Sequence, residues 1–414
     1  MMKQDKKYLV IDLFAGCGGL SLGLYQAGWN GLFAIEKNAN AFETLNYNLI
    51  KGKKHFAWPK WLPQSCLDII EVNKNYREQL MQLRGEVDLV AGGPPCQGFS
   101  MAGKRIKDDV RNQLVFLYID FISMVQPKLI LFENVKGFTY AFNKKKNQDT
   151  IPYSQIVTDK LRALGYDVMA QVIDFSKYGI PQRRKRFILV GVKDGNEGSA
   201  QKFFDMLDEQ KNKFLKHYNL LDVCTISEAI SDLLQENGIV ETPDRKGFSS
   251  GIYGEIKSPY QRLMRKGLPK SQIIPDSHSF AHHSQNKLMM FGKLLSDYPI
   301  KGKRIDGKAR DIWGIRQRGI TILNPNDIAP TITNMPDDYL HYCEPRILTV
   351  RECARIQSFP DWYEFKSKYT TGGKMRKHEV PRYSQVGNAI PPLFALQAGL
   401  VLKEMLNNYG RIEI

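Results

Sequence analysis

The sequence lacks the cysteine pattern of a disulfide or zinc protein. Its 414 residues include six cysteines, and no two of them form a Cys-x-x-Cys pair. So few cysteines in a chain of this length exclude a disulfide scaffold, and their spacing gives no support to a zinc ribbon or a thioredoxin-like site. We therefore expect a reducing, intracellular setting.

Long apolar runs are also missing. No segment approaches the roughly 20 uninterrupted apolar residues that a bilayer-spanning helix needs, so no membrane partner is expected. The basic start, residues 3–7, followed by the apolar residues 8–11, resembles a secretion signal, but Asp12 interrupts the apolar stretch. We interpret this start as a charged lead into a buried strand.

Acidic residues are scarce relative to basic ones. The chain has 59 Lys and Arg against 43 Asp and Glu, a formal net charge of +16. Residues 257–318 alone hold 14 Lys and Arg and four Asp and Glu, with aromatic residues and histidines interleaved. An excess of this kind indicates a polyanionic partner such as nucleic acid, and says nothing about the fold.

The first half of the chain alternates between short apolar runs and helical patterns. The expected strands are residues 8–14, 32–35, 87–91, 129–132, 168–173 and 187–192; helices are expected near 20–25, 39–49, 114–125 and 155–164. This order predicts an α/β fold, a doubly wound and mostly parallel sheet with helices on both faces. Ligands of such sheets bind at the carboxyl ends of the strands.

From about residue 194 the regular pattern fades, which we interpret as a domain boundary. Glycine, proline and polar residues interrupt the periodicity there. Helical patterns return at residues 350–359 and 392–406.

A glycine-rich loop follows the first expected strand. Gly16, Gly18 and Gly19 allow a tight turn and close approach of a ligand to backbone N–H groups. By itself the loop fits a dinucleotide, another nucleoside cofactor or simple helix–strand packing. Glu36 at the end of the second strand favours the interpretation as a nucleoside site, because a carboxylate there can accept hydrogen bonds from both ribose hydroxyls. Asp68 is a candidate contact for an adenine amino group or, equally well, a helix or turn cap.

Two prolines precede Cys96 at the end of the third expected strand. Pro94 and Pro95 lack N–H groups, so the chain leaves the sheet there and presents Cys96 at the carboxyl end of the strand. Cys96 is either a nucleophile on a loop or an inert thiol. Glu133 ends the next strand and is expected in the same crevice, where partial burial would raise its pKa, unless it is a helix N-cap.

Residues 182–186, a glutamine followed by four basic residues, precede the last expected strand of this half. Alternation along the strand would send Arg184 and Arg186 to one face and Lys185 to the other, and a solvated basic stripe is the ordinary interpretation. His278 and His282 lie four residues apart, but other metal ligands are lacking nearby, so we expect no metal.

Six segments, in order along the chain, resemble the motif set of the DNA cytosine-5 methyltransferases of bacterial and phage restriction–modification systems. They are residues 12–19, 93–100, 133–135, 182–186, 346–361 and 385–392. Together they span nearly the whole chain. The segment between Arg186 and Arg346 matches no motif; in this family that position holds the variable target recognition domain, and the basic excess falls there.

The resemblance implies a role for each matching residue. Cys96 would add to C6 of cytosine and make C5 electron-rich. Glu133 would meet N3 and the exocyclic amine as a proton donor, and Arg186, with Arg184 as second candidate, would meet O2. The methyl donor would be S-adenosylmethionine, with no metal. Its site would comprise Asp12, Phe14, Ala15, Gly16, Gly18, Gly19, Glu36, Asp68, Pro94, Leu114 and Asn388.

The resemblance also implies a domain layout and a partner. Residues 1–193 and 384–414 would form a Rossmann-like catalytic domain, and residues 194–383 a smaller, irregular target recognition domain with a scaffold motif at 346–361. Double-stranded DNA would be the partner, with the target base flipped out of the helix. We expect a cytoplasmic monomer of prokaryotic or phage origin, and a cognate restriction endonuclease is an open possibility.

Three rival functions are weighed against this hypothesis. A transfer RNA methyltransferase of the same chemistry would carry a Cys-Phe-Thr tripeptide, which this chain lacks. An NAD-dependent oxidoreductase would explain the glycine loop alone. A non-catalytic DNA-binding protein on the same fold would not need Cys96, Glu133 and Arg186.

Overall fold

The chain forms two compact units. A computed structural model describes residues 7–95, 113–140, 151–315, 318–371, 375 and 379–409. The first unit comprises residues 1–174, 185–212 and 394–414, and the second comprises residues 175–184 and 213–393. The second unit therefore includes the short segment 175–184, which the sequence pattern assigned to the sheet domain.

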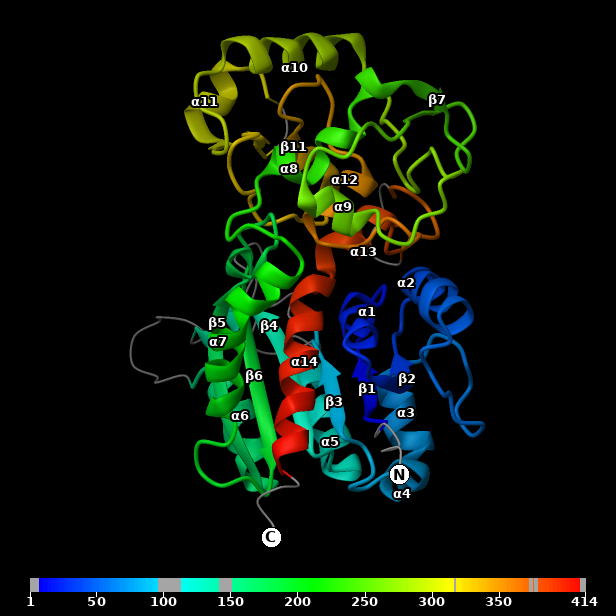
Figure 1. Ribbon diagram of the computed structural model, residues 1–414, viewed down its shortest axis with the longest axis vertical. Helices are drawn as coiled ribbons and strands as arrows, with labels where there is room; N and C mark the ends of the chain where they lie inside the picture. The colour runs from blue at the N-terminus through cyan, green and yellow to red at the C-terminus, as the bar shows by residue number, and fades with distance from the viewer. Residues whose placement is uncertain are drawn as a thin grey trace. The chain divides into compact units, whose positions relative to one another are not determined.

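A six-stranded sheet forms the centre of the first unit (Figure 1). Its strands are β1 (Leu9–Leu13), β2 (Asn30–Ile35), β3 (Leu89–Gly92), β4 (Leu129–Val135), β5 (Tyr166–Asp174) and β6 (Lys185–Lys193), in the spatial order β2-β1-β3-β4-β6-β5. Strands β2, β1, β3 and β4 are parallel, while β6 runs antiparallel to both β4 and β5. The predicted mostly parallel sheet is confirmed.

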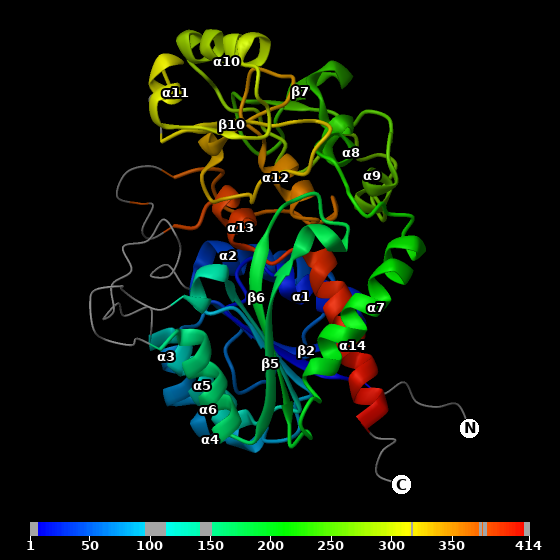
Figure 2. The same cartoon turned by 90° about the vertical axis from the view of Figure 1, so that its left-hand side faces the viewer.

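Helices cover both faces of this sheet, as its apolar strands require (Figure 2). All four residues of β3 and the first four of β4 are buried, the pattern of strands covered on both sides. Helices α3 (Ile69–Asn75), α4 (Arg77–Gln82), α5 (Gln113–Val125) and α6 (Tyr153–Ala163) lie on one face, with α1 (Gly19–Gln26), the first part of α7 (Gln201–His217) and α14 (Pro392–Tyr409) on the other.

Two helical segments differ from the sequence-based expectation. The helix expected over residues 39–49 is α2 (Ala39–Leu45), which continues as a π-helix, η1 (Asn46–Gly52). Helix α7 was not predicted at all, because the irregular region was expected to begin at residue 194. Its apolar residues, including Phe203 and Leu207, recur at helical spacing and are buried.

One stretch, residues 382–408, is long and apolar enough to cross a membrane by length and composition. It contains α14 and the shorter α13 (Arg382–Asn388). Of its apolar window, 78% is buried inside the protein, which is the pattern of a core helix.

The second unit combines short helices with small sheets. Its helices are α8 (Ile226–Ile230), α9 (Pro259–Met264), α10 (Gln285–Asp297), α11 (Gly307–Ile312), α12 (Val350–Ile356) and α13; its strands are β7 (Ile239–Glu241), β8 (Ser249–Gly251), β9 (Arg304–Ile305), β10 (Ile320–Ile322) and β11 (Tyr339–Leu340). A cluster around Phe291 and Leu294 of α10 packs on the three-stranded sheet β11-β10-β9.

Helix α12 is buried over its entire length and is held in place by ion pairs between side chains. Thr349 and Glu352 form a capping box at its start. Arg351 pairs with Asp276 at 2.9 Å, and Arg355 pairs with Asp232 at 3.1 Å and with Asp361. Asp232 and Asp276 come from distant parts of the unit, so the motif at 346–361 ties the unit together.

Candidate active site

The loop after β1 has a backbone that only a few residue types adopt comfortably. Phe14, Gly16 and Gly18 have φ angles of 59°, 57° and 89°, and Gly18 is the N-cap of α1. Positive φ is free of strain for glycine but uncommon for Phe14, and strained backbone of this kind clusters at ligand sites. A Cβ on Gly16 would meet nothing within 4 Å, so there is open space beside this turn.

Glu36 lies against this loop. One carboxylate oxygen of Glu36 accepts a hydrogen bond from the Gly16 N–H at 2.9 Å, and the other accepts one from the Asn38 N–H at 2.6 Å. Burial raises the pKa of Glu36, although these N–H groups partly offset the effect. The two N–H bonds orient the carboxylate at the carboxyl end of β2.

Asp12 in β1 is a buried carboxylate behind the loop. Its Oδ2 accepts a hydrogen bond from the Ser21 hydroxyl of α1, while its Oδ1 has no hydrogen-bond partner in the part of the chain that the structure describes. Burial raises the pKa of Asp12 to about 7. Ser21 is a neighbour that sequence reasoning missed, because nothing in its spacing distinguishes it from an ordinary helix residue.

Asp68 is a helix cap, one of the two roles that the sequence left open. Its Oδ1 accepts a hydrogen bond from the Ile70 N–H at 3.0 Å at the start of α3, and its Oδ2 pairs with Lys37 at 2.6 Å. The Leu67 N–H donates to the Glu36 carbonyl at 2.8 Å, which brings Asp68 close to the end of β2. Leu114, near the start of α5, is half-buried against the same core.

The ends of β3 and β4 carry the predicted catalytic groups. Gly92 of β3 pairs with Phe132 of β4, so Gly93 and Glu133 come directly after neighbouring residues. Glu133 forms an ion pair with Arg186 of β6, with 2.9 Å between Oε1 and Nε. Burial lowers the pKa of Arg186, and the Glu133 carboxylate opposes that shift. Cys96 lies outside the described residues, which end at Pro95 on this side.

Arg184 and Arg186 do not share a strand face, which corrects the prediction from alternation. Strand β6 begins at Lys185, so the alternation rule does not apply to Arg184. The Arg184 guanidinium is buried in the second unit and donates to the carbonyls of Ile332, Gly387 and Ala389 at 3.0–3.2 Å. Three backbone carbonyls on one guanidinium favour a structural role, and the geometry favours Arg186 of the two.

Asn388 lies in the second unit and is exposed at the end of α13. Its neighbour Gly387 is packed tightly, because a Cβ there would lie 2.4 Å from the Thr333 carbonyl oxygen. The assignment of Asn388 to the cofactor site remains a prediction.

Histidines that looked like a metal pair have other roles. The two ring nitrogens of His278 are bonded to the Thr349 hydroxyl at 2.8 Å and to the Leu233 carbonyl at 2.9 Å. His282 stacks on Phe248. Across residues 7–95, 113–140, 151–315 and 318–371, no group of three His, Cys, Asp or Glu side chains is arranged to hold a metal.

Cysteines buried elsewhere in the described chain are not activated. Burial raises the pKa of Cys17 in the glycine loop to about 12 and raises that of Cys224 and Cys353 as well. At neutral pH these thiols stay protonated and act as small apolar side chains.

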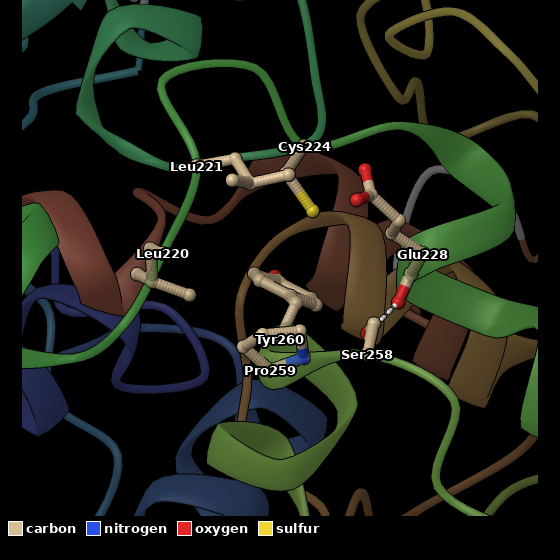
Figure 3. Close-up of a pocket in the computed structure, with 7 residues that line it drawn as sticks. All are labelled: Leu220, Leu221, Cys224, Glu228, Ser258, Pro259 and Tyr260. Carbon is tan, nitrogen blue, oxygen red and sulfur yellow. Dashed lines mark hydrogen bonds between the residues drawn. The ribbon is translucent and has the colours of Figure 1, made fainter.

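A small pocket in the second unit carries no comparable chemistry (Figure 3). Its lining comprises Leu220, Leu221, Cys224, Glu228, Ser258, Pro259 and Tyr260. The Glu228 carboxylate is occupied by the Thr225 capping box, and the Ser258 hydroxyl donates to the Glu228 carbonyl at 2.6 Å. The potentially reactive groups are therefore used by the fold.

Comparisons with known proteins identify the family of the chain. A family model described as "C-5 cytosine-specific DNA methylase" matches residues 8–403. The type II methyltransferase M.DdeI of Desulfomicrobium norvegicum is 30% identical, over 93% of this chain and 86% of that protein. The type II methyltransferase M.XorII of Xanthomonas oryzae pv. oryzae is 29% identical, over 94% of this chain and 83% of that protein.

A solved structure has the same fold. The crystal structure of a DNA modification methyltransferase encoded within an E. coli prophage superimposes with a TM-score of 0.66 at 24% identity, over 97% of this chain and 100% of that one. The family model covers almost the entire chain, including the glycine loop and the Glu133–Arg186 pair. The chain therefore belongs to the C-5 cytosine-specific DNA methylases.

Proposed function

We propose that this DNA cytosine-5 methyltransferase methylates a cytosine flipped out of duplex DNA, through a covalent bond between Cys96 and C6 of the base. The Glu133–Arg186 pair at the carboxyl end of β4 and the start of β6 carries the proposal. An acid and a guanidinium at this edge of the sheet can meet N3 and O2, where negative charge builds up when a thiolate adds to C6. Cys96 follows the end of the neighbouring strand β3.

The proposed reaction balances in three steps. The Cys96 thiolate gives its electron pair to C6, and the C5–C6 π electrons move toward C5 while Glu133 and Arg186 meet the charge on N3 and O2. C5 would then form a bond to the methyl carbon of S-adenosylmethionine, and the electrons of the broken C–S bond would stay on sulfur, which leaves as the neutral thioether S-adenosylhomocysteine. A base removes the C5 proton, and the electrons of that bond reform the C5–C6 double bond and expel Cys96 as a thiolate. Glu133 takes its proton back from N3 as the double bond reforms, and the base passes the C5 proton to solvent, so each protein group ends in its starting state.

The residues after β1 and β2 suit S-adenosylmethionine, whose sulfonium supplies an electrophilic methyl group. Three features of this chain fit it: the open space beside Gly16, the oriented Glu36 carboxylate, and the buried Asp12 oxygen that bonds to no described residue. We assign the ribose hydroxyls to Glu36, and the neighbourhood of the adenine to Asp68 and Leu114. Phe14, Ala15, Gly18, Gly19, Pro94 and Asn388 complete the proposed site.

Target recognition is assigned to the second unit and the basic segment within it. Residues 257–318 would bind phosphates, independently of sequence and sensitively to salt, while a few side chains read base edges. Replacing several lysines and arginines of this segment by glutamine should flatten the salt dependence of DNA binding. An unchanged slope would locate the phosphate contacts elsewhere.

The type II methyltransferase names of the relatives support a bacterial or phage restriction–modification context. We propose that the enzyme acts as a cytoplasmic monomer on double-stranded DNA. A cognate restriction endonuclease would cut DNA at the sequence that this enzyme methylates. DNA methylated by this enzyme should be resistant to such an endonuclease, and unmethylated DNA should be cut.

Covalent trapping tests the proposed chemistry directly. Wild-type enzyme with S-adenosylmethionine should form a denaturant-resistant adduct with 5-fluorocytosine duplex DNA, because fluorine at C5 blocks the final elimination. Cys96→Ala should form no adduct while still binding cofactor and DNA. The matched control is Cys343→Ser, which replaces an exposed cysteine of the second unit. Adduct from the Cys96 variant would refute the nucleophile assignment. Labelling of transfer RNA in a parallel reaction would favour the rival substrate.

A further inference from the structure

The residue after Glu133 holds the start of the Cys96 loop. Asn134, the next residue of β4, is buried, with 3% of its surface exposed. Its Nδ2 donates to the Pro94 carbonyl at 3.3 Å, and its Oδ1 accepts a hydrogen bond from the Val135 N–H at 2.8 Å. β3 and β4 are neighbours in the sheet (Figure 1), so this side chain links the ends of two adjacent strands.

The orientation of this amide is fixed by its partners. The Val135 N–H can only donate, so it must face Oδ1, and the Pro94 carbonyl can only accept, so it must face the Nδ2 amino group. The amide therefore has one productive orientation. A side chain of the same shape that carries an ionised carboxylate has no donor and cannot make the bond to Pro94.

The held carbonyl lies just ahead of the proposed nucleophile. Cys96 follows Pro94 by two residues, and the intervening Pro95 has its φ angle fixed by its ring. A stiff segment of two prolines transmits the position of the Pro94 carbonyl to the residues that follow more faithfully than an ordinary loop would. Fixing that carbonyl limits the directions in which the chain can continue toward Cys96.

The same corner of the sheet also fixes Glu133. A Cβ on Gly93 would lie 2.8 Å from Glu133 Oε2 and 3.2 Å from the Glu133 carbonyl oxygen, so the loop begins in direct contact with this side chain. Gly93, Pro94, Glu133 and Asn134 thus form one packed corner. Motion of the loop start relative to Glu133 is restricted by this packing and by the Asn134 bond.

We propose that Asn134 is a positioning residue, whose amide fixes the start of the Cys96 loop relative to Glu133 so that the thiolate and the acid engage the same cytosine ring. The proposal rests on the proposed role of Cys96. It adds a residue that touches neither the base nor the cofactor. A misplacement of about 1 Å in such a pair costs on the order of a hundredfold in rate.

The sharpest variant is Asn134→Asp, which keeps the shape and the bond to Val135 but turns an oxygen toward the Pro94 carbonyl. We expect the rate of adduct formation with 5-fluorocytosine DNA to fall about tenfold or more. The dissociation constant for DNA should change less than about twofold, because no DNA contact is assigned to Asn134 or to its partner Pro94. A loss confined to binding would overturn the proposal.

The pH profile gives a signature that a general packing defect would not produce. Once protonated, the carboxyl group that Asn134→Asp introduces can donate to the Pro94 carbonyl again. The ratio of variant to wild-type adduct rate should therefore rise as the pH falls from about 8 to about 6. Taking the ratio cancels the effect of pH on the thiolate itself. A ratio that stays flat across this range would contradict the positioning role.

Asn48→Asp is the matched control. Asn48, in the π-helix η1 of the same unit, is also buried. Its Nδ2 donates to the Thr44 carbonyl of α2 at 2.8 Å. This variant should lose stability yet form adduct at the wild-type rate per folded molecule. If wild-type enzyme forms no adduct, the proposed function fails. If wild type reacts and Asn134→Asp reacts equally fast, only the positioning role fails.

Discussion

Two acid–arginine clusters in this protein are built from the same kinds of side chain but differ in accessibility. At the rim of the sheet, the side chains of Arg186 and Glu133 remain 14% and 15% exposed. Around α12, Arg355, Asp232 and Asp361 are fully buried, and the arginine bonds to both carboxylates. A pair in contact with solvent can exchange its partner for a substrate, whereas a sealed network cannot change partners without leaving a buried charge. Access, rather than ion pairing, distinguishes the proposed catalytic cluster from the structural one.

Neutralising Glu133 in the Glu133–Arg186 pair, the rim cluster, should have the largest effect of the predicted substitutions. The effect should fall on turnover alone. Glu133→Gln keeps the size of the side chain but cannot transfer a proton at N3, so we expect kcat to fall by about 10²–10⁴. The melting temperature and the dissociation constant for S-adenosylmethionine should stay close to wild type. Steady-state methylation and calorimetry on the same preparation check both. A variant that unfolds early but keeps its turnover would reverse the comparison.

Breaking the buried cluster should have the opposite signature. Arg355→Met removes a partner that Asp232 and Asp361 share and leaves them only the longer ion pairs with Arg265 at 3.4 Å and Arg351 at 3.8 Å. Breaking buried ion pairs in this way costs about 3–5 kcal/mol. Urea unfolding should show the loss, while turnover per folded molecule remains within a few fold of wild type.

The control for this variant is Lys211→Met on α7. Lys211 pairs with Asp208 at 2.9 Å, and the Asp208 side chain is mostly exposed to solvent. Loss of this pair should therefore cost no more than about 1 kcal/mol. Equal effects of the two substitutions would show that the α12 network contributes no more than a surface pair.

The sequence specified the sheet and the rim cluster better than it specified the second unit. Apolar runs ending in Glu36 or Glu133 are local signals, because the carboxyl end of a parallel strand is a ligand site in any doubly wound sheet. The roles of Arg184 and Arg355 depend on carbonyls and carboxylates more than a hundred residues away. Spacing within a motif carries no information about such partners. Asn134 was missed because a polar residue beside Glu133 looks like ordinary strand-end polarity.

Acid should destabilise the second unit more than the first. Burial lowers the pKa of His278 and His283 to about 4 and that of His341 to about 3. Each is neutral when folded and titrates near 6.5 when unfolded, so its contribution is complete above about pH 6.5 and is lost as the pH falls toward about 4. In the first unit, Asp12 with a pKa of about 7 and His55 with one of about 4 shift stability in opposite directions over this range.

Hydrogen exchange followed peptide by peptide between about pH 7 and pH 5 can separate the two units. We expect protection in the second unit to fall with acid while protection in the sheet changes less. His278→Gln removes one titrating group, so it should flatten the pH dependence of the second unit's stability by up to about 1.4 kcal/mol per pH unit. Parallel loss in both units would show that the buried histidines do not set the difference.

The smallest expected effect concerns Asp68, for which a structural role and a binding role can be separated. Asp68 caps α3, and asparagine is as good a cap as aspartate, so Asp68→Asn should leave stability nearly unchanged while Asp68→Ala costs about 1 kcal/mol. If Asp68 also accepts a hydrogen bond from the adenine amino group, both variants should weaken S-adenosylmethionine binding, by calorimetric titration, by a similar several-fold factor. Asparagine can still offer its oxygen to the adenine, but it must turn the amide away from the Ile70 N–H to do so. A cofactor affinity that follows only the loss of stability in the alanine variant would make Asp68 a cap and nothing more, and would move it to the structural side of the comparison.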